Sequence, residues 1–237
     1  MLNEPGRNVI KPATNGASAS PWDDDLISSL ALYPSTVSLE SLIITEELGW
    51  RAARAPEFEA ENEAIVGLMR ALKESNAKVL QVLAETALRL SRAHSAAVSV
   101  EEAEEGRKIF RWHAAAGQWL PLLGKTVPRE GSPCGVALDR RVPLLIARPE
   151  RHFNYGNDSV PPVFEALLVP FEVAGETVGT VWVAAHDESR RFDGEDLRLL
   201  KNLSEFASLA FHVLRRTESV RDSLRDLHKA LAGLADE

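Results

Sequence analysis

Two consecutive stretches of the chain carry apolar residues at the helical period. The first begins at Pro56, a residue type favoured in the first turn of a helix. Its apolar positions recur at intervals of three and four and comprise Phe58, Ile65, Leu68, Met69 and Leu72. The second follows Ser75, which can cap a helix, and comprises Val79, Leu80, Leu83, Ala87, Leu88 and Leu90. The pattern predicts two amphipathic helices ahead of the first strand.

Beyond His94 the pattern becomes strand-like. Short apolar runs cover 96–100, 109–116, 142–147, 166–173 and 177–185. An acidic turn at 101–106 joins the first two runs, and a tight turn at 174–176 joins the last two, so the sheet is expected to be mainly antiparallel. Residues 117–139, with one helical turn at 136–141, and residues 148–162 form long irregular connections, which are typical of binding loops.

A long helix is predicted to close the chain. Asp193 can cap it, and Asp196 lies in its first turn, where a negative charge favours the helix dipole. Its apolar stripe alternates steps of four and three and comprises Phe206, Ala210, Val213, Thr217, Val220, Leu224, Leu227, Leu231 and Leu234. This is the seam of a coiled coil, with Val213, Val220, Leu224, Leu227 and Leu231 as the expected dimer contacts. A second copy of the same chain is the simplest partner.

The N-terminal part gives weaker indications. Residues 1–25 are rich in Asn, Pro, Ala, Ser and Gly and end in an acidic run, which is typical of a disordered tail. Residues 26–55 are interpreted as an N-terminal extension, in which 26–48 have no decisive periodicity beyond a short helix expected after Ser38. Residues 56–211 form the predicted domain with its leading helices, and 212–237 the coiled-coil extension.

Composition narrows the classes of protein. With 237 residues, 45% of them hydrophobic, 26% charged and a net charge of −8, the chain fits one soluble domain with extensions. The acidic field disfavours nucleic-acid binding. A single cysteine excludes an internal disulfide, and no run reaches the roughly 18 apolar residues of a membrane span. We therefore expect a cytoplasmic protein with neither nucleic-acid nor membrane partners.

The order of elements indicates an α+β fold: an antiparallel sheet of five to six strands with helices on one face. The string EALLVPFEVAGETVGTVWVAAHDESRRFDGEDLRLLKNLSEFASLAF, from Glu165 to Phe211, resembles the GAF family, as do FRWHAAAGQW and PREGSPCGVALDRRVPLLI before it. In particular, residues 56–216 resemble the input domains of bacterial sensor histidine kinases. The resemblance implies a ligand pocket on the sheet face opposite the helices and dimerisation through flanking helices.

In such a pocket the covering loops would carry Trp119, Cys134, His152, Phe153 and Tyr155, while either Trp112 or His113 would point inward from its strand. Aromatic rings and an imidazole suit a flat ligand that stacks and receives a few hydrogen bonds. The alternative is that these side chains fill the domain's own cavity.

The sequence identifies no cofactor, and a small organic ligand is expected. Cys134 precedes a helical turn that can lower a thiol pKa, yet a buried hydrophobic role is favoured. Family members that attach tetrapyrroles have a Cys-His pair, whereas Gly135 follows Cys134; haem lacks a second axial candidate. One cysteine cannot complete methionine-sulfoxide reduction, and the cyclic-nucleotide pattern has only a faint counterpart at 190–193. No histidine pair has metal-site spacing.

The sequence therefore predicts a sensory, regulatory domain rather than an enzyme, since no Ser-His-Asp set or phosphate loop is present. It would bind a small ligand and signal through dimer helices in bacterial two-component signal transduction, with a histidine kinase or another signalling protein as partner. The alternative is a dimeric adaptor that binds no ligand and recruits a partner protein. The ligand, the output partner and the extent of the whole protein stay open.

Overall fold

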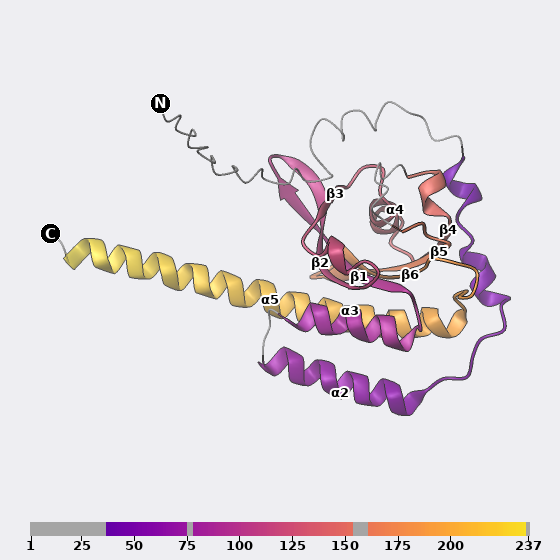
Figure 1. Cartoon of the computed structure of the whole chain (residues 1–237). Coiled ribbons are helices and arrows are strands. Elements are labelled where there is room, and N and C mark those ends of the chain that lie inside the picture. The colour runs from indigo at the N-terminus through magenta and orange to yellow at the C-terminus, as the bar shows by residue number, and fades with distance from the viewer. Residues whose placement is uncertain (1–36, 75–77, 154–160, 236–237) are drawn as a thin grey trace, which may run out of the picture.

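A computed structural model describes residues 37–74, 78–153 and 161–235, with side chains described as far as residue 228. Its helices and strands run in the following order (Figure 1): η1 Leu39–Ser41, η2 Thr45–Gly49, α2 Phe58–Glu74, α3 Val79–Leu90, β1 Ser95–Glu104, β2 Arg107–Gly117, η4 Leu120–Leu122, β3 Thr126–Pro128, α4 Pro133–Arg140, β4 Leu144–Ala147, η5 Pro149–Arg151, β5 Glu165–Val173, β6 Glu176–Ala185 and α5 Gly194–Ala235. The predicted tail at 1–25, the cap at Ser75 and the candidate Tyr155 lie outside the described residues.

The strands form a six-stranded sheet in the order β3-β2-β1-β6-β5-β4, and all of the pairings are antiparallel. The antiparallel α+β prediction is confirmed. The five predicted strand runs match β1, β2, β4, β5 and β6. Strand β3 lies in a segment that the sequence predicts to be irregular. Its three residues are too few to show a recognisable pattern. The first hairpin turns at Glu105 and Gly106 and the last at Ala174 and Gly175, all with positive φ, as two-residue hairpins require.

Helices cover one face of the sheet, here called the helix face. The core on this face is formed by residues of α3 and α5 and by the strand residues that point toward these two helices. It includes Leu83, Val98, Val183, Leu200 and Phe211. The opposite face is covered by α4 and the connecting segments, and it has its own core around Phe110, Trp112, Trp182 and Leu168. The strands are therefore buried on both faces, with alternate residues contributing to each core.

The first predicted helix is less buried than its pattern indicates. In α2, Leu68 is fully buried, but Phe58, Ile65 and Met69 are 68%, 45% and 61% exposed. Figure 1 shows that α2 lies outside α3, away from the sheet, so it packs on the domain by a narrow contact. Periodicity correctly predicted the helix, whereas the width of its buried face depends on tertiary packing.

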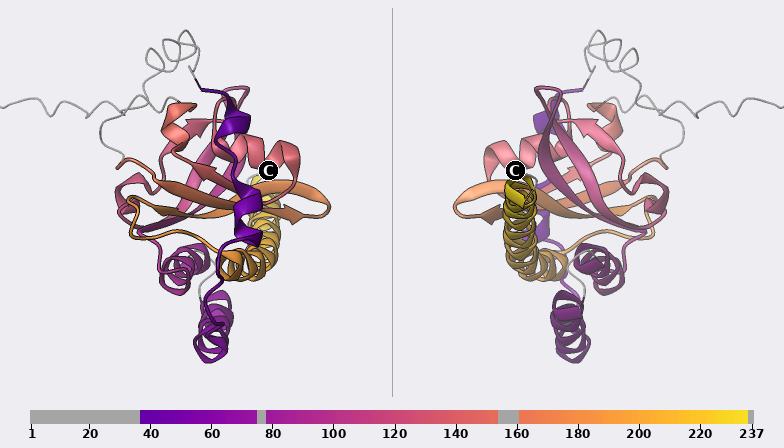
Figure 2. Two further views of the ribbon diagram at one scale, coloured as in Figure 1. Left: turned by 90° about the vertical axis from the view of Figure 1, so that its right-hand side faces the viewer. Right: turned by 90° about the vertical axis from the view of Figure 1, so that its left-hand side faces the viewer.

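Residues 37–54, here called the N-terminal strap, run along the β4 edge of the sheet (Figure 2). Ile43 bridges Ile146, and the Ile44 N–H donates to the carbonyl of Leu145 at 2.8 Å. The Arg51 guanidinium makes two hydrogen bonds to Glu165, at 2.9 and 2.8 Å. The segment interpreted as an extension is thus packed against the domain over this part, and the short helix expected after Ser38 is η1.

The start of α5 is fixed by a buried polar cluster. Asp193 Oδ1 accepts hydrogen bonds from the Glu195 and Asp196 N–H groups, at 2.8 and 3.1 Å, so the predicted cap is confirmed. In turn, Asp196 Oδ2 accepts a hydrogen bond from the Asp193 N–H at 2.9 Å. The Asp196 side chain is fully buried and forms ion pairs with Arg54 and Arg190. This reciprocal capping, reinforced by two guanidinium groups, sets the direction in which α5 leaves the sheet.

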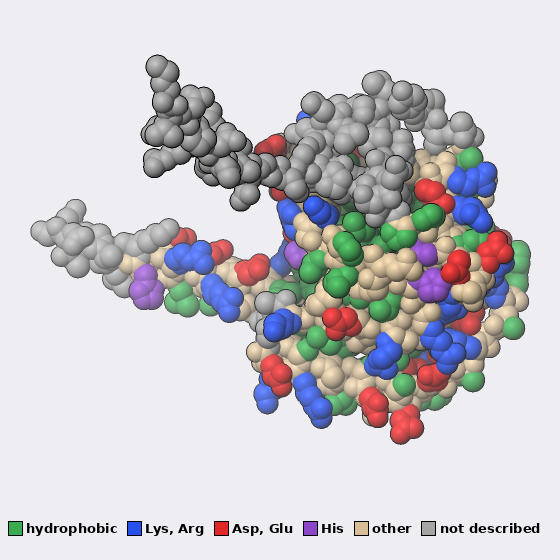
Figure 3. Space-filling view, viewed as in Figure 1, with side chains coloured by type: hydrophobic (Ala, Val, Ile, Leu, Met, Phe, Trp, Pro, Cys, Tyr) green, Lys and Arg blue, Asp and Glu red, His purple; other side chains and the backbone are tan. Residues whose placement is uncertain are grey.

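The 42-residue helix α5 packs on the helix face and then projects from the body (Figure 1). Among the described side chains, Phe211 is the last buried one in α5, and those from Glu218 to His228 are all exposed. In Figure 3, apolar side chains lie among charged ones on this projecting part. Within the described residues, none of the helices is both long enough and apolar enough to span a bilayer.

Candidate functional site

Three tryptophans meet on the sheet face opposite α3 and α5. Trp112 comes from β2, Trp182 from β6, and Trp119 from the turn that leads into η4. Ring centroids are 4.8 Å apart for Trp112 and Trp182, 4.3 Å for Trp119 and Trp182, and 5.2 Å for Trp112 and Trp119. All three are at most 6% exposed. Strand alternation places Trp112 and Trp182 here, and we call the three residues the tryptophan cluster.

The indole N–H groups of this cluster differ in their hydrogen bonding. Trp182 Nε1 donates to the Ser99 hydroxyl at 3.1 Å. Trp119 Nε1 is buried and has no hydrogen-bond partner in the described part of the chain, although the side chain is only 1% exposed. A buried donor without an acceptor costs roughly 1–3 kcal/mol, and most such groups in proteins are paired with protein, water or ligand. This unpaired donor is the feature of the cluster that calls for an explanation.

Cys134 is the second residue of α4 and lies close to the tryptophan cluster in the same core. Ser132 caps this helix by accepting the Gly135 N–H at 3.0 Å, and the Thr180 hydroxyl donates to Cys134 Sγ at 3.3 Å. Burial raises the pKa of the thiol to about 11, against the smaller lowering by its hydrogen bonds. The thiol is therefore protonated at neutral pH despite its place at a helix N-terminus.

Native Cys134 should consequently resist alkylation. Thiolate is the reactive form, so a pKa near 11 slows iodoacetamide labelling at pH 8 by about 100-fold relative to an unfolded thiol, before burial is counted. Mass spectrometry of protein labelled with and without urea measures both rates. Native labelling within about tenfold of the denatured rate would show that the thiol is accessible and ionised.

The histidines named as candidates are placed differently. His113 lies on the helix face, 6.0 Å from the Phe211 ring, and its Nε2 is 2.6 Å from Glu102. A β-bulge opposite Val98 and Ser99 leaves His113 without a cross-strand partner, and Trp112 is the one that points to the opposite face. His152 hydrogen-bonds the Val37 carbonyl through Nδ1 at 2.8 Å and contacts the ring of Phe153.

Of the seven predicted site residues, the structure thus brings four into one buried core: Trp112, Trp119, Cys134 and Phe153. His152 lies beside this core, His113 lies across the sheet from it, and Tyr155 is outside the described residues. The prediction that these residues bind a ligand is not decided by this placement, because each buried ring also fills the core.

Sequence reasoning missed Trp182 and His186, which continue the alternation of β6 toward this face. The His186 ring lies 5.8 Å from Trp119. Its Nδ1 is 2.8 Å from the Pro162 carbonyl and its Nε2 is 2.7 Å from the Ser95 hydroxyl. Burial lowers the pKa of His186, with a further lowering from His94, so the neutral ring donates through Nδ1 and accepts through Nε2. The spacing Trp182, Ala184, His186 was the available indication.

Comparison with known proteins shows which family has this architecture. A sequence model described as "GAF domain" matches residues 74–212, which is more than half of the chain. The chain belongs to the GAF domain family. The matched segment covers the central sheet and α5 as far as residue 212, while the N-terminal strap and most of α2 precede it and the rest of α5 follows it.

Solved structures share the fold at low identity. Free methionine-R-sulfoxide reductase from Neisseria meningitidis, solved with its substrate, has a TM-score of 0.55 and 13% identity, covering 70% of this chain and 97% of that one. The GAF-B domain of DevS from Mycobacterium smegmatis gives 0.50 and 20%, covering 62% and 99%. The phycoerythrobilin-bound GAF domain from a cyanobacterial phytochrome gives 0.52 and 9%, covering 68% and 96%. These identities establish the fold alone.

Metal binding receives no support from the geometry. In the described ranges, no group of three or more His, Cys, Asp or Glu side chains is arranged to hold a metal ion. Among the described residues, Cys134 and His186 lie beside the tryptophan cluster; burial raises the pKa of Cys134 and lowers that of His186, which favours the neutral form of each. The cluster itself consists of three buried indole rings in mutual contact and includes one fully buried donor, Trp119 Nε1, that has no partner in the part of the chain that the structure describes.

Proposed function

We propose that this GAF domain is a sensory module that binds a small planar ligand at the tryptophan cluster and signals through α5 in a dimer. The supporting observation is the buried Trp119 N–H without a partner in the described part of the chain. A ligand that places a carbonyl oxygen or ring nitrogen on this donor would satisfy it while stacking on the indoles. No catalytic step is part of this proposal.

Strand β6 connects the tryptophan cluster directly with the surface on which α5 packs. Within β6, Trp182 belongs to the tryptophan cluster, while its neighbours Val181 and Val183 are packed in the core shared with α3 and α5. A ligand that displaces Trp182 by a fraction of an ångström would therefore shift the surface on which α5 packs. The size of the response is limited by the difference in ligand affinity between the two packings.

The projecting part of α5 is the proposed dimer element. Val220, Leu224 and Leu227 are 58%, 51% and 55% exposed, and they follow the seam that starts at Val213. Apolar side chains at these intervals are covered when two such helices form a coiled coil.

We further propose that the protein acts in the cytoplasm, with a histidine kinase or another signalling protein as the recipient of the signal.

A dimeric adaptor is the second candidate, and it also has a specific observation in its favour. Trp112, Trp119, Cys134 and Phe153 are each at most 6% exposed, so they can be read as core of a domain that needs no ligand. In that case the helices would recruit a partner protein, and the unpaired Trp119 donor would be a tolerated cost.

Native mass spectrometry of gently purified protein separates the two candidates. We expect the wild type to carry a small molecule that is released on denaturation. Trp119→Phe keeps an aromatic ring but removes the donor, so ligand retention should weaken about five- to tenfold. The matched control Trp50→Phe changes a tryptophan that is 77% exposed and lies outside the tryptophan cluster, and it should retain the ligand fully.

The adaptor gives a different pattern. The wild type would carry no additional mass, and neither would Trp119→Phe, which would melt at a lower temperature only because the smaller ring leaves a cavity in the core. That pair of results would contradict ligand sensing at the tryptophan cluster.

A further inference from the structure

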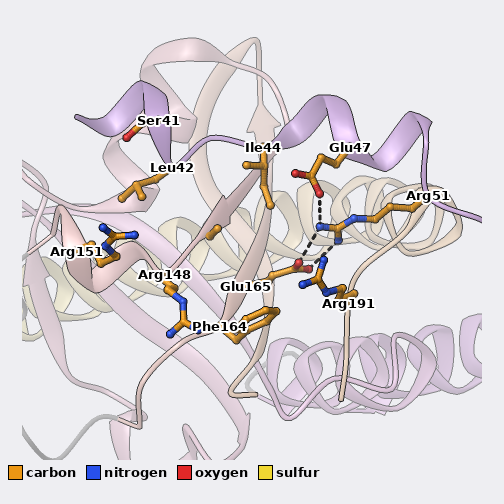
Figure 4. A pocket seen from close by; sticks show the side chains of 11 residues that line it. Ser41, Leu42, Ile44, Glu47, Arg51, Arg148, Arg151, Phe164, Glu165 and Arg191 are labelled. Atoms are coloured by element: carbon orange, nitrogen blue, oxygen red, sulfur yellow. Dashed lines mark hydrogen bonds and ion pairs between the residues drawn. The ribbon is translucent and has the colours of Figure 1, made fainter. Parts of the chain in front are cut away.

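A separate cavity lies at the β4 edge of the domain, between the N-terminal strap and the start of β5. Its volume is about 280 Å³, and none of the three tryptophans lines it. Figure 4 shows Ile44 of the strap and Phe164 on opposite sides of this space, with arginine side chains around it. The cavity thus combines apolar walls with a concentration of positive charge.

The charges that line the cavity do not balance. Four arginines, at positions 51, 148, 151 and 191, face two glutamates, at positions 47 and 165. The Arg51 guanidinium donates hydrogen bonds to both carboxylates, at 2.9 and 2.8 Å to Glu165 and at 2.7 Å to Glu47. Glu165 also accepts the Phe192 N–H at 3.1 Å. Both carboxylates are therefore compensated without the other three arginines.

The carboxylates near the other three arginines lie outside the lining of the cavity. Arg148 approaches Glu188 at 3.9 Å, and Glu150 interacts electrostatically with Arg148 and Arg151. Among the described residues, no ion pair holds Arg151 or Arg191, and four arginines against two glutamates line the cavity itself. The cavity therefore carries an excess of positive charge within a protein whose net charge is −8. Such a local excess attracts anions although the protein as a whole repels them.

Two of the guanidinium groups are also held in place. Arg148 and Arg191 both lie over the ring of Phe164, at 5.1 and 5.3 Å from its centroid. The backbone N–H of Arg148 donates to the Phe164 carbonyl at 3.0 Å, which fixes the backbone from which the Arg148 side chain extends. A guanidinium stacked on a ring keeps its N–H groups available in its own plane, in the geometry that binds carboxylate or phosphate through two parallel hydrogen bonds.

We propose that this cavity, here called the arginine pocket, binds a small organic anion with a carboxylate or phosphate group. Arg148 and Arg191 hold the anionic group, Arg151 adds to the positive field, and the apolar part of the ligand lies against Leu42, Ile44 and Phe164. Because the strap forms one wall and β5 the other, a bound anion would tie the strap to the sheet. This site is independent of the ligand proposed for the tryptophan cluster.

Calorimetric titration with inorganic phosphate and with succinate, at constant ionic strength, tests the arginine pocket. We expect saturable binding of at least one of these probes, and whichever binds identifies the anionic group. Arg148→Gln combined with Arg191→Gln should weaken binding about tenfold or more, since both charged hydrogen-bond donors are lost. Both side chains are exposed enough that folding, checked by circular dichroism, should be preserved.

The matched control is Arg216→Gln combined with Arg221→Gln, which removes two exposed positive charges from α5 and leaves the arginine pocket intact. Its affinity for the probe should stay within about twofold of the wild type. The proposal is overturned if neither probe binds up to about 10 mM, or if the control weakens binding as much as the pocket variant does.

Discussion

Replacing Leu224 and Leu227 by glutamate is expected to convert the proposed dimer into a monomer. Both side chains are more than half exposed in the single chain, on a part of α5 that projects from the body. In a coiled coil each buried leucine contributes roughly 1.5–3 kcal/mol, and the substitution removes both leucines from both helices. It also sets glutamates against each other across the seam. Analytical ultracentrifugation at micromolar concentration measures the change in mass.

The control variant for this experiment is Ser219→Glu combined with Arg225→Gln. It lowers the net charge by the same amount, on the same exposed part of α5, but at positions away from the seam. We expect it to remain dimeric. A leucine variant that sediments as the wild type does would remove the coiled coil from the proposed mechanism and leave α5 without an assigned partner.

Asp196→Ala is expected to lower the free energy of unfolding by about 3 kcal/mol, the lower end of the range for breaking a buried ion pair. Asp196 is fully buried and pairs with Arg54 and Arg190, whose side chains are 17% and 15% exposed. Its removal leaves two guanidinium groups poorly solvated and also removes the acceptor of the Asp193 N–H. Urea denaturation at one fixed protein concentration measures the loss.

Asp222→Ala is the comparison for that loss. Asp222 and Arg225 form the same kind of ion pair, at 3.0 Å, but both side chains are about two thirds exposed. An exposed pair contributes about 0–1 kcal/mol, so this variant should unfold close to the wild type. Equal losses in the two variants would mean that the cluster at the start of α5 does not stabilise the fold through its burial.

The candidate sites depended on contacts between distant parts of the chain. Trp119 could be proposed from its loop, but its neighbours Trp182, in β6, and His186, just after β6, lie more than 60 residues further along the chain. The arginine pocket could not be predicted, since its arginines come from the strap, the segment after β4 and the segment before α5. Spacing along the sequence carries no information about such a convergence.

What the sequence alone determined were the features that repeat within a few residues. The periods of two and three to four residues predicted the five main strands and three helices, and Asp193 marked the start of α5. The tertiary structure decided the rest: the strand order, the third strand β3, the packing of the strap on β4, and the exposure of Phe58 and Met69 on α2. The physical reason is that periodicity assigns a side chain to a face of its own element, whereas the neighbour that covers this face comes from elsewhere in the fold.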